Sequence, residues 1–257
     1  MAEIITVFNH KGGVGKTTTS LNLTAAIAKM GIHPLGIDLD PQAHFSLASG
    51  VIAPSPEKSL FGFFQNDTPL ERLMYATEGG WTMIPSHMSL AKVDALHGAN
   101  PKIAGKLKVG LKESHLYKQY PIIIDCCPTL GVLTLNAVLA SDRILIPVSP
   151  DFLSLQGVER LEGALKVLEK NLNRSIPRRI LVTRFDARRR LSYTIYDQIA
   201  ERYGHLLCRT RISESVALAE SPSFKRDIFR HAPHSPGARE YMSLALELVE
   251  SGFFEIH

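Results

Sequence analysis

Residues 9–20 read NHKGGVGKTTTS, and the types and spacing of these residues suit them to holding phosphate groups. Gly12, Gly13 and Gly15 leave the backbone bare, so that successive N–H groups can close around phosphate oxygens. Lys16 then supplies a point charge for the β- and γ-phosphates, and the Thr17 hydroxyl is placed to bind magnesium. The stretch therefore predicts a phosphate-binding loop.

A strand must enter such a loop and a helix must leave it, and the sequence supplies both. Residues 4–8 are a run of β-forming residues. After the loop, Leu23, Ile27 and Met30 recur at helical spacing, and Gly31 marks the expected end of the helix. The start of that helix adds the positive end of its dipole to the loop. We therefore expect the strand–glycine loop–helix order of a P-loop.

Carboxylates end two further predicted strands. Residues 34–40, PLGIDLD, contain Asp38 and Asp40, whose spacing of two puts both side chains on the same side of the strand. Residues 121–128, PIIIDCCP, are an apolar run ended by Asp125, a pattern typical of a buried parallel strand. Ligands of α/β proteins gather at the carboxyl ends of strands, where Asp38 and Asp40 should lie.

The loop departs from the common pattern GxxxxGK[ST], because His10 stands at the first glycine and a second lysine, Lys11, begins KGGVGKTT. This loop resembles the deviant Walker A loop of the ParA/MinD superfamily of ATPases, and DLDPQA and DCCPTLGVLTLN resemble further ParA motifs, with Cys127 in place of the more usual proline. The resemblance implies ATP and Mg²⁺ as cofactors. It also implies that Lys11 reaches the nucleotide of a second subunit and that Asp40 positions the attacking water.

The expected site follows from these motifs. The catalytic residues are Lys11, Lys16 and Asp40. The nucleotide-binding residues are Lys11, Gly12, Gly13, Val14, Gly15, Lys16, Thr17 and Thr18. The magnesium-binding residues are Thr17, Asp38 and Asp125, with Asp38 near the metal.

The rest of the chain alternates between strand-like and helical segments. Further strands are expected at 81–85, 143–147 and 179–184, and helices at 101–120, 151–171 and 191–203. Repeated alternation predicts an α/β fold with a doubly wound, mostly parallel sheet flanked by helices. No linker, repeat or low-complexity segment interrupts the pattern, so we expect residues 1–257 to form a single domain of the P-loop NTPase type.

Composition narrows the class of protein. A chain of 257 residues with 45% hydrophobic residues is long enough for a substantial core. No apolar stretch approaches a membrane span and no signal segment is evident, so we expect a cytoplasmic protein without a membrane partner. The cysteines, Cys126, Cys127 and Cys208, form neither a disulfide framework nor a suitable ligand set for an iron–sulfur cluster. The net charge of +4 is too mild to indicate nucleic-acid binding by itself.

Arginines gather in the C-terminal third. Clustered arginines at a loop and at a helix start suit phosphate contacts without base readout. We therefore expect a non-specific DNA surface that includes Arg184, Arg188, Arg189, Arg190, Arg209 and Arg211, the last two on a strand. Glu214 and Ala217 stand where members of the ParA family often carry arginines, so this surface is thinner at that spot.

The resemblance as a whole implies an ATPase that forms an ATP-sandwich homodimer, binds DNA non-specifically and positions a cargo over the nucleoid. That cargo is a plasmid, a chromosome origin or a protein assembly, and a ParB-like or adaptor protein stimulates slow hydrolysis. The chain begins at the first predicted strand, so we expect the short form without an N-terminal DNA-reading domain.

Two alternatives share the fold. A MinD-like membrane-cycling regulator needs a basic amphipathic C-terminal helix, whereas this chain ends in the acidic LALELVESGFFEIH. A metabolic P-loop ligase, such as a cobyrinate amidase, would show substrate-dependent turnover and no DNA binding.

Overall fold

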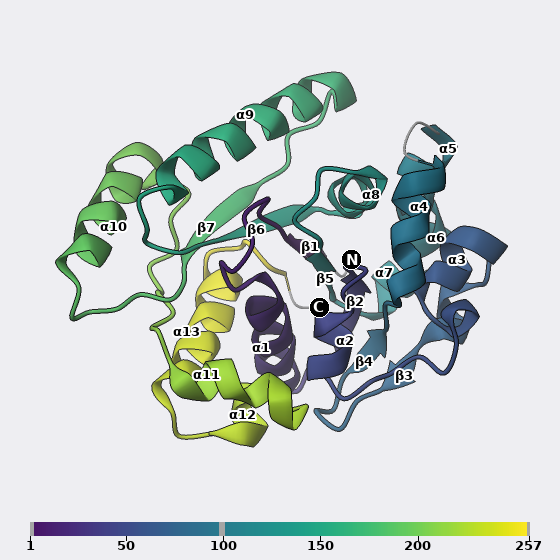
Figure 1. Ribbon diagram of the computed structural model, residues 1–257, viewed down its shortest axis with the longest axis horizontal. Coiled ribbons are helices and arrows are strands. Elements are labelled where there is room, and N and C mark those ends of the chain that lie inside the picture. The colour runs from purple at the N-terminus through teal and green to yellow at the C-terminus, as the bar shows by residue number, and fades with distance from the viewer. Residues whose placement is uncertain (1–2, 98–100, 256–257) are drawn as a thin grey trace.

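A seven-stranded sheet crosses the centre of the molecule in the order β3-β4-β2-β5-β1-β6-β7 (Figure 1). The computed structural model describes residues 3–97 and 101–255. The parallel strands are β1 (Ile4–Val7), β2 (Leu35–Leu39), β4 (Thr82–Ile84), β5 (Ile122–Cys126), β6 (Arg143–Val148) and β7 (Arg178–Val182). Strand β3 (Tyr75–Ala76) pairs antiparallel with β4 at one edge. The expected mostly parallel, doubly wound sheet is confirmed.

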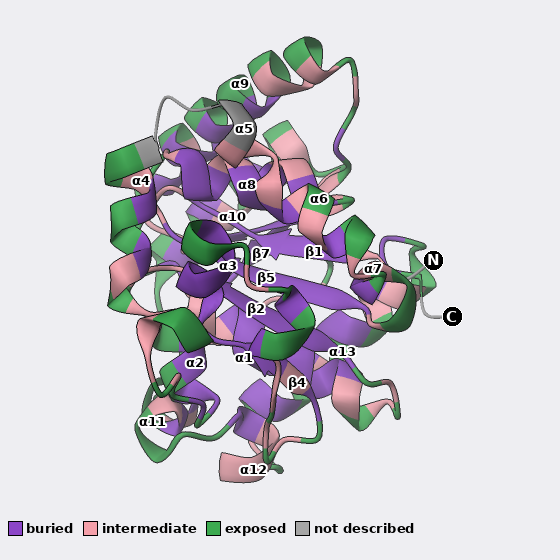
Figure 2. Cartoon of the chain, turned by 90° about the vertical axis from the view of Figure 1, so that its right-hand side faces the viewer, coloured by how far each residue is buried: buried purple, intermediate pink, exposed green. Residues whose placement is uncertain are grey.

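Helices cover both faces of this sheet (Figures 1 and 2). One face carries α1 (Lys16–Lys29), α11 (Val216–Glu220), α12 (Ile228–His231) and α13 (Pro236–Glu250). The other carries α3 (Leu60–Asn66), α6 (Lys106–Glu113), α8 (Val132–Ala140), α9 (Ser154–Leu172) and α10 (Arg190–Tyr203). The short elements are α2 (His44–Ala48), α4 (Ala91–His97), α5 (Pro101–Ala104), α7 (Leu116–Gln119) and the 3₁₀ turns η1 (Pro56–Lys58), η2 (Leu70–Leu73), η3 (Met88–Leu90) and η4 (Ser221–Phe224). Among the residues described, no helix combines the length and the apolar character needed to cross a bilayer.

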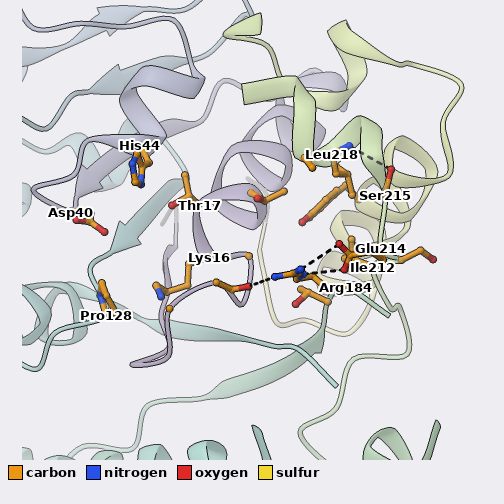
Figure 3. A pocket seen from close by; sticks show the side chains of 18 of the residues that line it. Lys16, Thr17, Asp40, His44, Pro128, Arg184, Ile212, Glu214, Ser215 and Leu218 are labelled. Carbon is orange, nitrogen blue, oxygen red and sulfur yellow. Dashed lines mark hydrogen bonds and ion pairs between the residues drawn. The ribbon is translucent and has the colours of Figure 1, made fainter. Parts of the chain in front are cut away.

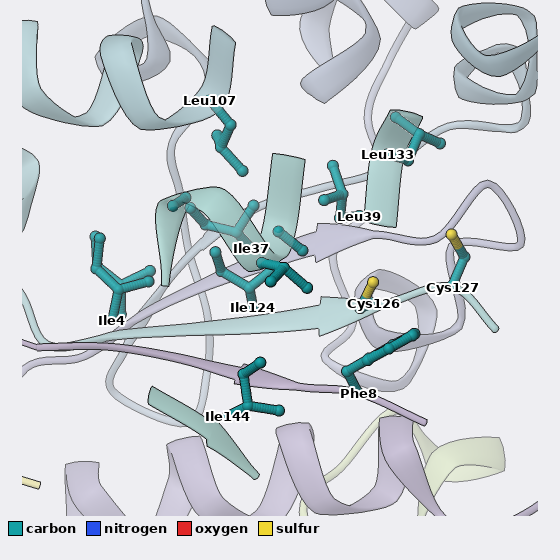
Figure 4. Packing of buried hydrophobic residues seen from close by; sticks show 14 of the residues in the cluster. Ile4, Phe8, Ile37, Leu39, Leu107, Ile124, Cys126, Cys127, Leu133 and Ile144 are labelled. Carbon is teal, nitrogen blue, oxygen red and sulfur yellow. The ribbon is translucent and has the colours of Figure 1, made fainter. Parts of the chain in front are cut away.

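Two hydrophobic cores lie on opposite sides of the sheet, because successive side chains of a strand point to opposite faces. Ile122 and Ile124 of β5 join the core under α8 and α9 (Figure 4). Ile123, between them, joins the core under α1 and α13. All three are fully buried, which explains why this strand reads as a continuous apolar run rather than an alternating one.

Two expected elements are wrong. Residues 101–120 form three short helices instead of one, because the chain breaks at Gly105 and again at His115, whose φ of 56° is left-handed.

Arg209 and Arg211 do not lie on a strand. Their segment makes only isolated bridges, which join Ile180 to Leu207 and Phe185 to Ser213.

Candidate functional site

The glycine loop lies between β1 and α1 at the carboxyl edge of the sheet. Gly13 and Gly15 have φ values of 74° and 80°, a backbone conformation that glycine adopts without strain. Thr183 Oγ1, at the end of β7, donates to the Val14 carbonyl oxygen at 2.8 Å and fastens the loop to the sheet. The Val14 side chain is buried, so it anchors the loop while its backbone remains part of the turn.

A cavity of about 550 Å³ opens over this loop, a size typical of small-ligand sites. In Figure 3, Asp40, His44 and Pro128 lie on one side of Lys16, and Arg184, Glu214, Ser215 and Leu218 lie on the other. Of the expected nucleotide-binding residues, the cavity lining includes Gly12, Gly13, Gly15, Lys16, Thr17 and Thr18.

Lys16 is 8% exposed, and its Nζ donates to the Lys11 carbonyl oxygen at 2.8 Å. Burial lowers the pKa of Lys16, while the nearby carboxylates of Asp125 and Asp40 oppose that shift. A buried ammonium group that lines a cavity favours an anionic ligand, because the anion compensates the lost hydration. The geometry therefore agrees with the expected role of Lys16 at a phosphate.

Asp125 is 1% exposed and is not part of the cavity lining, but it contacts Thr17, which is. Its two oxygens accept hydrogen bonds from Thr17 Oγ1 and Ser20 Oγ, both at 2.8 Å. Asp38 is its neighbour in register across the β2–β5 pair. Burial, and then the charge of Asp38, raise the pKa of Asp125 to about 8. Burial raises that of Asp38 to about 7. A divalent cation would favour the ionised forms, so the Thr17–Asp125 pair fits magnesium.

Asp38 and Asp40 differ in their surroundings although both end β2. Asp38 is fully buried, and one of its oxygens accepts from Ser46 N at 2.8 Å and Ser46 Oγ at 2.6 Å. Its other oxygen accepts from Asp40 N at 3.1 Å, so Asp38 fixes the turn that presents Asp40. Asp40 lines the cavity, whereas Asp38 is not part of the lining. The magnesium role of Asp38 and the water-positioning role of Asp40 stay predictions.

Lys11 is not part of the cavity lining. Its ammonium group forms an ion pair with Asp151 and lies 3.5 Å from Ser154 Oγ. Burial acts to raise the pKa of Asp151, but hydrogen bonds from Lys11 and Ser149 outweigh it, and the pKa is lowered. Sequence reasoning missed Asp151. Asp151 follows β6, and only the strand order of the structure places β6 beside β1.

The structure separates the six expected DNA-binding arginines. Arg184 lines the cavity: its guanidinium donates to the Gly13 carbonyl oxygen at 3.0 Å and pairs with Glu214 at 3.0 Å. The Arg211 guanidinium lies over the rings of Phe185 and Tyr196, 4.4 and 4.8 Å from their centroids. Both guanidinium groups are therefore engaged by other groups of the protein, although the Arg184 side chain is still 55% exposed.

The remaining arginines are more accessible. The side chains of Arg188 and Arg189 are 87% and 76% exposed, and both pair with Asp186. Hydrogen bonds from Arg188 lower the pKa of Asp186 to about 2. Arg190 opens α10 and is exposed, and Arg209 approaches Glu247 at 3.9 Å. Residues 188–190 thus form a run of three consecutive exposed arginines on the predicted surface.

Three apolar side chains near the loop were not found from the sequence. Leu130 and Phe152 are each 72% exposed, and Leu153 is 60% exposed. Leu130 follows β5, and Phe152 and Leu153 follow β6, so they come from the loops on either side of the β1 loop. We call them the loop-flanking apolar patch. Exposed apolar groups gathered at one edge are typical of a protein interface.

Comparison with known proteins extends over nearly the whole chain. The family model described as an AAA domain matches residues 2–177. The sporulation initiation inhibitor protein Soj of Bacillus subtilis (strain 168) is 32% identical over 255 residues, which cover 98% of this chain and 100% of that protein. The chromosome-partitioning ATPase Soj of Thermus thermophilus is 36% identical over 250 residues, 95% of this chain and 94% of the other. The crystal structure of cobyrinic acid a,c-diamide synthase from Mycobacterium smegmatis with bound ADP and magnesium is 27% identical with a TM-score of 0.83, covering 98% and 97% of the two chains.

Proposed function

Because the chain belongs to the ParA-type ATPases of the ParA/MinD superfamily, we propose that it is an ATP-dependent dimerising ATPase that binds DNA non-specifically and positions a cargo over the nucleoid. The observation that carries the proposal is the position of Lys11. Its ammonium group pairs with Asp151 and is not part of the cavity lining, whereas most of the following loop residues are. The cargo is a plasmid, a chromosome origin or a protein assembly.

In this proposal, different residues at the cavity bind the phosphates of ATP and the magnesium ion. Loop amides and Lys16 bind the β- and γ-phosphates, and Thr17 and Asp125 hold Mg²⁺ directly or through water. Bound magnesium neutralises charge on the phosphates. Asp40, in the cavity wall, orients the water that attacks. Catalysis in such a site is mostly positioning and electrostatics, so a slow reaction that a ParB-like or adaptor protein stimulates is consistent with it.

Dimerisation completes the site in this proposal. Lys11 exchanges Asp151 for the nucleotide of the partner subunit, and the loop-flanking apolar patch is buried between the subunits. A direct test is sedimentation velocity with ATP for Phe152→Glu. The matched control is Val167→Glu, which places the same charge at a 63% exposed site on α9. We expect dimers for the wild type and for Val167→Glu but monomers for Phe152→Glu, and dimers of all three would contradict the interface.

DNA binding then depends on ATP because two weak surfaces act together. Each neutralised phosphate releases counterions. For a dimer with roughly six phosphate contacts, the logarithm of the binding constant should therefore fall with the logarithm of salt concentration with a slope of about −5. Residues 188–190 supply three consecutive exposed arginines of each subunit.

The experiment that tests the function measures binding to a random-sequence duplex at several salt concentrations, with ATP and with ADP, both with magnesium. We expect binding with ATP alone, indifferent to sequence and steeply weakened by salt. Replacing Arg188, Arg189 and Arg190 by alanine should weaken it and reduce the slope, while Lys166→Ala on the exposed face of α9 should not. No binding in either nucleotide state would refute the DNA-binding part of the proposal.

A second candidate is a small-molecule ligase, favoured by the 27% identity to the diamide synthase over nearly all of both chains. Its distinguishing property is ATP turnover that depends on a carboxylic acid substrate rather than on DNA or a protein activator. Comparing ATP hydrolysis with DNA, with a protein activator and with candidate acids separates the two functions.

A further inference from the structure

A second cavity, of about 590 Å³, lies at the opposite edge of the sheet. Its lining includes Ile4 at the start of β1, Arg143 at the start of β6, and residues of α6 and α7. Strands of four to six residues at about 3.3 Å per residue put this edge some 15 Å from the glycine loop. We call it the amino-edge cavity. It is independent of the nucleotide site.

Three cationic side chains converge on the amino-edge cavity. Lys108 and Lys112 lie four residues apart on α6 and so share one helix face, and Arg174 comes from the loop between α9 and β7. Burial lowers the pKa of Lys108, and the nearby charges of Arg174 and Lys112 lower it further. Because all three side chains line one cavity, their positive charges repel one another across a common space.

These three cations form no ion pair within the part of the chain that the structure describes, although the charge of Asp142 opposes the lowering of the Lys108 pKa. No carboxylate there lies within 4.0 Å of the charged nitrogens of Lys108, Lys112 or Arg174, and Arg174 donates instead to the Ser141 carbonyl oxygen.

The cavity's acidic residues are engaged elsewhere. Glu3 forms an ion pair with Arg143 at 2.7 Å, and Asp142 accepts from Ile4 N at 3.0 Å. Glu255 also lines the cavity, and its N–H donates to Glu3 at 3.0 Å. The cavity therefore offers three positive charges while two of its carboxylates are held by protein donors.

The chemistry of the lining indicates the ligand class. A guanidinium fork and two ammonium groups match a phosphate group, which Arg binds bidentately. Tyr117 adds a phenol, and Leu111 and Ala140 give the lining an apolar part. The volume suits a small organic molecule. We propose that the amino-edge cavity binds a small phosphorylated ligand, through Lys108, Lys112 and Arg174.

Calorimetric titration of inorganic pyrophosphate into the full chain tests the proposal. The protein is first saturated with ADP, so that the glycine loop is filled, and magnesium is omitted because it complexes pyrophosphate. We expect saturable binding to the wild type. Lys112→Gln, at an exposed position that does not support the fold, should weaken binding about tenfold, and Lys112→Arg should retain it. Lys108→Gln combined with Arg174→Gln should abolish it.

Lys166→Gln is the matched control, because it removes one exposed lysine from α9 away from the cavity. Wild-type protein that gives no binding, or variants of Lys108, Lys112 and Arg174 that bind as the wild type does, would overturn the proposal. A third result would also overturn the proposal: pyrophosphate binds to neither the wild type nor the variants, and a random DNA duplex binds less tightly to the variants than to the wild type. That result would assign the three cations to a nucleic-acid backbone.

Discussion

Replacing Asp125 by asparagine should stabilise the protein when magnesium and nucleotide are absent, although it removes the proposed metal-binding carboxylate. Asp125 is 1% exposed and lies beside the fully buried Asp38 in register. Burial and the Asp38 charge raise the pKa of Asp125 to about 8. Two adjacent buried carboxylates resist full ionisation, so the folded state without metal carries an electrostatic cost at neutral pH.

The sign and size of the effect follow from the raised pKa values. In the unfolded chain the group titrates near about 4, so its protonated form favours the folded state fully below that pH. That contribution is lost as pH rises through about 7 to 8, the values reached by Asp38 and Asp125. Because the pair titrates as a unit and the site can relax, we expect removal of one carboxylate to stabilise by about 2 kcal/mol at about pH 8. For a chain of this length that is roughly 4 to 8 °C in Tm.

Thermal unfolding followed by circular dichroism, in a metal chelator at about pH 5 and about pH 8, measures the effect. We expect the Tm of the wild type to fall as pH rises relative to Asp125→Asn, so that the variant is the more stable only at the higher pH. Glu113→Gln, at an exposed position on α6, controls for removal of one negative charge. Added Mg²⁺ and ADP should raise the Tm of the wild type but not of Asp125→Asn. A variant that is equally destabilised at both pH values would refute the reasoning.

Three further predictions concern Asp40, Asp151 and Arg178. Asp40→Ala should keep ATP-dependent dimers while phosphate release slows by about 100-fold; normal hydrolysis would show that this carboxylate does not position the water. Asp151→Asn should free Lys11 from its ion pair. Because that pair is partly exposed, the dissociation constant of the ATP dimer, measured by sedimentation velocity, should fall by roughly two- to fivefold. An unchanged dissociation constant would contradict the idea that Asp151 restrains Lys11. Arg178 pairs with Glu162 at 2.7 Å and with Glu169 at 2.8 Å. Arg178→Ala should therefore lower the free energy of unfolding, measured by urea denaturation, by about 3 kcal/mol. A change below about 1 kcal/mol would mean that the two glutamates find other partners.

The glycine loop and the two carboxylate-ended strands could be predicted because their signals are local. Residues 9–17 carry their phosphate chemistry in consecutive positions, and the apolar run before Asp125 indicates a buried strand without knowledge of its neighbours. The helices around residues 101–120 show the limit of such patterns. Leu107, Leu111 and Leu116 are all buried as helical spacing suggests, yet the breaks at Gly105 and His115 leave no trace in that spacing.

The contacts that distinguish this site join residues far apart in the chain, so sequence patterns could not find them. Lys11 meets Asp151 because β1 and β6 are adjacent in the sheet, and the sequence does not contain the strand order. Arg184 meets Glu214 for a similar reason, since the end of β7 and the segment between α10 and α11 line the same cavity. An arginine predicted for DNA was therefore found in the cavity wall.

The central position of β1 has a consequence for how the protein is made. Strand β1 is made before the other strands of the sheet, yet its neighbours among the described residues are β5 and β6, through partners such as Ile122 for Ile4 and Arg143 for Ile5. Until residue 148 has emerged, this apolar strand has no complete set of neighbours, and such distant pairings form slowly. In the nascent chain, transient contacts or a chaperone must therefore cover β1 until its neighbours have been made. The cavity over the glycine loop is also lined by residues as late as Tyr241, so it is complete only after most of the chain has been synthesised.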